Sequence, residues 1–208
     1  MNLKKLKQAE EIFLQSYPGG FNHPDMMAMG KKHKMDKMIL FTQESFSEER
    51  FKDPDGIIDN MAKIISRSSM VSMFEKPKFK GFVNSLHLDD KELLAKGLKK
   101  QLYGEEEEGF KTILEILSSR KLAKWPLITA CPVYFRPQVE VFIKPTTVKG
   151  VIEFFELKPL QYKPLPSWAF YQAYRAIIQE MKSNLDVSLY PDNAAFSGFL
   201  MMSLENKF

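Results

Sequence analysis

Hydrophobic residues recur at three- and four-residue intervals along most of this chain, which is the spacing of amphipathic helices. The clearest case lies between residues 168 and 185, where one side of a helix would be apolar and the other polar. Ser167 precedes this run as an N-cap, and so continuous an apolar side must be buried. The apolar side consists of Phe170, Tyr171, Tyr174, Ile177, Ile178, Met181 and Leu185, and the polar side of Gln172, Arg175, Gln179 and Lys182.

The same spacing predicts further helices, with turns and prolines between them. Asp89 with Glu92 resembles a capping box, and the glutamates at 105–108 suit the positive end of a helix dipole. Three prolines between 125 and 137 allow only a short helix there. We therefore expect an all-α fold, an irregular multi-helix bundle with proline-rich connectors. The further helices are predicted at 2–16, 35–41, 57–74, 79–86, 89–102, 105–117 and 192–204.

The stretch KPTTVKGVIEFFELKPLQYKPLPSW, residues 144–168, fits two different structures. As a strand it would present Glu156-Leu157-Lys158 as the acid-x-lysine element of a restriction-type nuclease. A hard divalent ion needs more than one carboxylate, and the upstream candidate is Asp55. This interpretation predicts a magnesium-dependent nuclease that uses Asp55, Glu156 and Lys158.

As a helix, the same stretch would begin at an N-cap, Thr146 or Thr147, and end before Pro159. One side would then be apolar, formed by Val148, Val151, Ile152 and Phe155. The cap and the proline favour the helix over the strand. Because Pro164 and Pro166 follow, the segment after the helix is predicted to be a stiff, extended connector to the next helix.

The composition is that of an ordinary globular protein, with 208 residues of which 44% are hydrophobic. A single cysteine, Cys131, excludes an internal disulfide, and the first residues lack the apolar run of a signal peptide. Charges interrupt every hydrophobic run, so we expect no membrane span and a soluble, cytoplasmic protein. One domain, 1–208, is predicted. The nearest candidate for an internal boundary is 119–125, between an N-terminal helical part, 1–119, and a C-terminal module, 120–208.

Positive charge is concentrated in the second half of the chain. The net charge is only +4, but residues 120–182 carry ten lysines and arginines against four acids. Aromatic residues lie in the same window, where they either build a core or stack on the bases of a single strand beside the cations. A solvated lysine-rich surface is the alternative explanation of the charge. The predicted nucleic-acid contacts are Arg136, Lys144, Lys149, Lys158, Lys163, Trp168 and Arg175.

Residues 120–204 resemble a module of uncharacterised bacterial proteins, some of them linked to restriction or phage-defence genes. The motifs that carry the resemblance are W-P-L-I-T from Trp125, F-R-P, F-I-K-P-T-T-V-K-G-V-I-E-F-F-E-L, Y-K-P-x-P-S-W-x-F-Y and A-A-F-S-G-F-L. The resemblance implies a bacterial origin and a nucleic-acid context. It supplies no catalytic or binding residue, so it does not indicate which reaction, if any, the protein catalyses.

Motifs for catalysis or metal binding are missing from the sequence. The three histidines, His23, His33 and His87, have no ligand-spaced partner, and glycine-rich phosphate loops are absent. We therefore predict no catalytic residue, no metal site and no cofactor. The leading hypothesis is a non-catalytic helical domain that binds nucleic acid or a partner protein through residues 120–182. The alternatives are the nuclease and a protein-interaction or structural domain with no nucleic-acid role.

Overall fold

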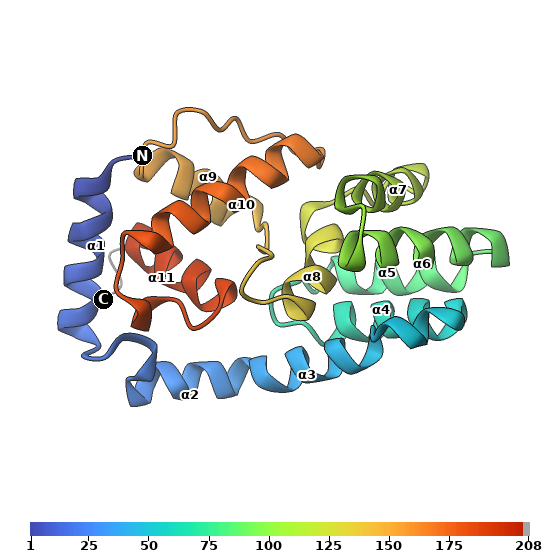
Figure 1. Ribbon diagram of the computed structural model, residues 1–208, viewed down its shortest axis with the longest axis horizontal. Coiled ribbons are helices and arrows are strands. Elements are labelled where there is room, and N and C mark those ends of the chain that lie inside the picture. The colour runs from blue at the N-terminus through green and yellow to red at the C-terminus, as the bar shows by residue number, and fades with distance from the viewer. Residues whose placement is uncertain (206–208) are drawn as a thin grey trace.

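The computed structural model describes residues 1–205, and in this range the chain forms α-helices and short 3-10 helices without a strand (Figure 1). The all-α prediction is therefore confirmed. The α-helices are α1 Leu3–Ser16, α2 Pro24–His33, α3 Met35–Ser45, α4 Pro54–Arg67, α5 Glu75–Asn84, α6 Leu88–Tyr103, α7 Glu106–Ser119, α8 Trp125–Phe135, α9 Pro145–Phe154, α10 Trp168–Ser183 and α11 Asn193–Glu205. The 3-10 helices are η1 Gly20–Asn22, η2 Glu48–Lys52 and η3 Val187–Leu189.

The helices form two groups that are joined along one side by a rod (Figure 1). In the first group α11 packs against α9 and α1, and α10 crosses them; in the second group α6 and α7 form the most extensive pair, beside α4 and α5. The rod is α2 and α3, which are separated only by Lys34 in the left-handed conformation. Since α1 packs on α11 and α8 packs on α3 and α4, helices from both sides of residues 119–125 lie against each other.

Side-chain caps set several of the helix starts, as their residue types predict. The Asn2 side chain accepts a hydrogen bond from the Lys5 amide at 3.1 Å at the start of α1. The Ser167 hydroxyl accepts one from the Phe170 amide at 3.4 Å at the start of α10, where a cap was expected. These local contacts explain why the helices begin where the sequence indicates.

Several predicted helix boundaries are wrong; α5, for example, begins at Glu75 and not at residue 79. α4 ends at Arg67 and does not reach Phe74, because the buried Ser68 hydroxyl turns inward to a 2.9 Å hydrogen bond with Tyr134. α6 begins at Leu88, so Asp89 lies in its first turn and does not cap it. α9 begins at Pro145, ahead of both threonines; proline fits a first helical position because its missing N–H would have no partner there.

Residues 144–168 form a helix followed by a connector, which decides between the two structures that the sequence allowed. α9 buries Val148 and Val151, and Phe155 is buried directly after it. Glu156 then takes a left-handed conformation with φ 54°, and the chain runs without regular structure to Ser167. The Trp125 indole donates a 2.8 Å hydrogen bond to the Lys163 carbonyl, which fixes this connector to the start of α8.

The core is rich in the aromatic residues of the second half. Trp125, Tyr134, Tyr171 and Tyr174 are all buried, so these four belong to the interior and are not available to stack on bases. Within residues 1–205, no helix combines the length and the apolar character that crossing a membrane requires.

Cys131 lies inside α8 with 1% of its surface exposed, and burial raises the pKa of its thiol to about 12. Thiol reagents attack the accessible thiolate, so the native protein should resist them. We expect iodoacetamide to alkylate Cys131 completely in concentrated guanidinium chloride and hardly at all in native buffer over the same time, as followed by intact mass. Equal labelling under both conditions would show that α8 opens readily.

Candidate functional site

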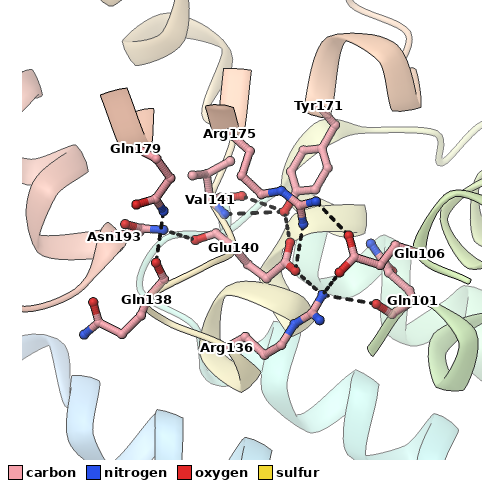
Figure 2. A network of polar contacts seen from close by, with 10 residues as sticks. All are labelled: Gln101, Glu106, Arg136, Gln138, Glu140, Val141, Tyr171, Arg175, Gln179 and Asn193. Carbon is pink, nitrogen blue, oxygen red and sulfur yellow. Dashed lines mark hydrogen bonds and ion pairs between the residues drawn. The ribbon is translucent and has the colours of Figure 1, made fainter. Parts of the chain in front are cut away.

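Glu140 is a carboxylate with 1% of its surface exposed, and three donors surround it at the junction of the two groups of helices (Figure 2). The Tyr171 hydroxyl donates to Oε2 at 2.5 Å, Arg175 Nη1 lies 3.1 Å from Oε1, and Arg136 Nη2 pairs with the same oxygen. Burial and the charge of Glu140 raise the pKa of Tyr171 well above 10, so its hydroxyl stays a donor. A buried charge with this many partners is compatible with a stable fold.

Glu106 is the second carboxylate of this group. Its oxygens accept from Arg136 at 2.9 Å and from Arg175 at 2.7 Å, so each guanidinium bridges both carboxylates. Burial raises the pKa of Glu106, but the hydrogen bonds and charges of Arg175 and Arg136 outweigh it and hold the pKa below its ordinary value. We call Glu106, Arg136, Glu140, Tyr171 and Arg175 the ion cluster. Its two positive and two negative charges balance.

The ion cluster is assembled from the ends of separate elements. Glu106 is the first residue of α7, and Arg136 follows the last residue of α8. The Glu140 amide donates to the Arg136 carbonyl at 2.9 Å, which closes a turn and brings the two side chains together. Tyr171 and Arg175 stand one turn apart on α10, on the same side of the helix. The cluster therefore connects α7 and α8 in one group of helices to α10 in the other.

A further row of polar contacts extends from the ion cluster to α11. Asn193 Nδ2 donates to the Glu140 carbonyl at 2.8 Å, and Lys182 Nζ donates to Asn193 Oδ1 at 2.8 Å. Lys182 is only 6% exposed, and burial lowers its pKa. Lys182 stands on the predicted polar side of α10, yet it is buried, because its long side chain reaches a partner on α11.

Three of the predicted nucleic-acid contacts lie within or beside this junction. Arg136 and Arg175 belong to the ion cluster, where both carboxylates neutralise their charge. Trp168 is half-buried, with its ring 5.7 Å from that of Phe110 and with the Arg175 guanidinium 5.5 Å from its centroid. These side chains are engaged in internal contacts, which leaves the lysines as the exposed cations of the predicted set.

Four lysines remain exposed on α9 and on the connector, and we call them the lysine face: Lys144, Lys149, Lys158 and Lys163. Lys144 directly precedes α9, and Lys149 lies on α9 with its Nζ 5.1 Å from the centroid of the half-buried Tyr162 ring. In the described part of the chain, none of the four forms an ion pair within 4.0 Å. Their charges are thus available to an external anion.

The structure does not bring Asp55, Glu156 and Lys158 together. Asp55 lies at the start of α4 and pairs with Lys91 at 2.6 Å, whereas Glu156 pairs with Lys5 at 3.1 Å beside the start of α1. Figure 1 shows α4 and the start of α1 in different groups of helices. Among residues 1–205, no cluster of three or more histidines, cysteines or carboxylates is arranged to hold a metal ion. A nuclease centre built on these three residues is therefore not formed.

Two open hollows adjoin the ion cluster on the surface of α10. One, of about 420 Å³, lies between Gln138 and Gln179; the other, of about 590 Å³, lies between Trp168 and the first turn of α7. The carboxylates of that turn are already paired, Glu107 with Lys111 and its neighbours with lysine or arginine. The lining of neither hollow contains a histidine, cysteine or serine, so neither holds a Ser–His or Cys–His pair.

Sequence reasoning missed the two carboxylates of the ion cluster. A local signal existed for Glu140, since it stands four residues after Arg136 and inside the apolar run Val139 to Ile143. An acid in such a run indicates a buried charge that needs a partner. No comparable signal marks Glu106, which stands in a run of four glutamates.

Comparisons of the chain with protein-family models, with curated proteins and with solved structures find no match. The resemblance of residues 120–204 to a module of uncharacterised bacterial proteins therefore stays a prediction.

Proposed function

We propose that this protein is a non-catalytic binding domain that contacts nucleic acid through the lysine face. The observation that carries the proposal is that the predicted cations differ in pairing: the arginines have carboxylate partners and the lysines have none within the described residues. Arg136 and Arg175 are partly buried and neutralised in the ion cluster, whereas the four lysines stay exposed and unpaired within the described residues. Lysine ammonium groups on flexible stems are suited to contact successive phosphates without reading sequence.

The backbone under the lysine face supports this role. Lys158 and Lys163 stand in a connector with prolines at 159 and 164, and the connector is tied to α8 through Trp125. A stiff backbone loses less conformational entropy when its side chains are engaged by a ligand. Lys149, held over Tyr162, presents its charge beside an aromatic ring that is partly exposed.

The test is fluorescence anisotropy of labelled DNA against the purified protein at about 50 and 200 mM salt. We expect binding that weakens steeply between the two salt concentrations, because neutralised phosphates release counterions. Changing both Lys149→Glu and Lys163→Glu should reduce affinity by about tenfold or more at the lower salt.

The matched control is Lys52→Glu with Lys96→Glu, two exposed lysines on η2 and α6 that undergo the same change of charge. The control should lose much less affinity than the variant of the lysine face. Equal losses would mean that only the net charge matters. No binding at the lower salt would reject the proposal and favour a protein-interaction domain.

A further inference from the structure

Met73 and Phe74 form an exposed apolar tip between α4 and α5. The two residues are 74% and 76% exposed, whereas Ser68 and Val71 of the same loop are buried. The Ser68 hydroxyl is bound to Tyr134 in the interior, and the Phe74 amide donates to Ser72 Oγ at 3.2 Å. Phe74 thus projects into solvent from a turn that contains these hydrogen bonds.

Two lysines follow this tip directly, Lys76 and Lys78 in the first turn of α5. Burial raises the pKa of the intervening Glu75, and the charges of Lys124 and Lys78 oppose this effect. An exposed aromatic ring among ammonium groups is the arrangement with which proteins hold unpaired bases and the phosphates between them.

The connector that carries Lys163 is joined to the start of α8. Lys124 is the N-cap residue of α8 and precedes Trp125, whose indole donates to the Lys163 carbonyl. Exposed lysines thus stand on the connector, at the start of α8 and at the start of α5: Lys163, Lys124 and Lys78. A duplex presents its phosphates to such lysines but keeps its bases stacked inside, whereas a single strand can offer a base to the ring.

We propose that Phe74 is a base-stacking contact that makes the surface bind single-stranded nucleic acid in preference to duplex. This inference rests on the proposed function of the lysine face. In this inference Phe74 selects single-stranded over double-stranded nucleic acid. The lysines contact the phosphates of either, independently of sequence.

The experiment compares a labelled oligo-dT of about 20 nucleotides with a duplex of the same length, using variants of one exposed side chain. Phe74→Ala and Phe74→Leu should each weaken oligo-dT binding by about tenfold and leave duplex binding within about twofold. Phe74→Trp should retain oligo-dT affinity, and binding should quench its emission relative to the wild type. The control is Val187→Ala, a residue 71% exposed on η3, which should bind like the wild type.

Three results would overturn the inference about Phe74 alone. If Phe74→Leu binds oligo-dT as well as the wild type, or if Phe74→Ala weakens duplex binding equally, the ring does not stack on a base. If instead the wild type binds vesicles rich in phosphatidylserine and Phe74→Ala alone abolishes that, the tip inserts into anionic membrane. In all three cases the Lys149 and Lys163 variant still tests the lysine face separately. A wild type that binds neither DNA rejects both proposals.

Discussion

Replacing Glu140 by glutamine is expected to lower the free energy of unfolding by about 3–5 kcal/mol, one of the two largest effects that we predict for a single substitution. The buried carboxylate accepts hydrogen bonds from Arg136, Arg175 and Tyr171. A neutral amide of the same shape leaves two guanidiniums to share Glu106. Its NH2 group also replaces the oxygen that accepts from Tyr171, so the Tyr171 hydroxyl loses this acceptor. The measurement is denaturation by urea, in which the midpoint should fall while the slope stays unchanged.

The matched control for Glu140→Gln is Glu107→Gln. Glu107 pairs with Lys111 at 2.6 Å on the surface of α7, where both side chains are more than half exposed. The same chemical change at this position should cost under about 1 kcal/mol, since exposed ion pairs contribute little. A loss at Glu140 no larger than the loss at Glu107 would mean that water reaches the ion cluster and screens its charges.

How far the sequence predicts this fold depends on the distance over which each contact acts. α10 is predicted with its cap at Ser167 and with its buried face because both signals lie within a few residues of each other. The end of α4 is not predicted, since it depends on Ser68 meeting Tyr134. A hydrogen bond between residues so far apart leaves no periodic trace in the sequence.

The candidate site follows the same rule. Exposure of Lys149 and Lys163 agrees with a polar helix side and a proline connector, both of which are local features. The arginines are different, because their partner Glu106 lies on α7, many residues before them. A count of charges along the chain treats Arg175 and Lys163 alike, but only the folded structure separates a neutralised cation from an available one.

Gly109→Ala is expected to destabilise the protein by about 3 kcal/mol, because α6 and α7 touch at this glycine. A Cβ atom at residue 109 would lie 2.3 Å from the Gln101 amide nitrogen and 2.5 Å from the Gly97 carbonyl oxygen. Both are backbone atoms of α6, so no side-chain rotation relieves the overlap and the two helices must separate. The separation would also disturb the ion cluster, since Glu106 lies one turn before Gly109 and Arg136 donates to the Gln101 carbonyl at 3.3 Å.

The control for Gly109→Ala is Gly81→Ala, for which we expect stabilisation instead of destabilisation. A Cβ atom at Gly81, in the interior of α5, would meet no atom within 4 Å, so alanine only reduces the entropy of the unfolded chain and favours the helix. Gly81→Ala should therefore stabilise the protein by roughly 0.5–1 kcal/mol. Helix propensity alone predicts a gain at both positions, and the packing of α6 against α7 predicts a gain at one and a loss at the other. A thermal midpoint of Gly109→Ala at or above that of the wild type would show that the two helices are not in this close contact.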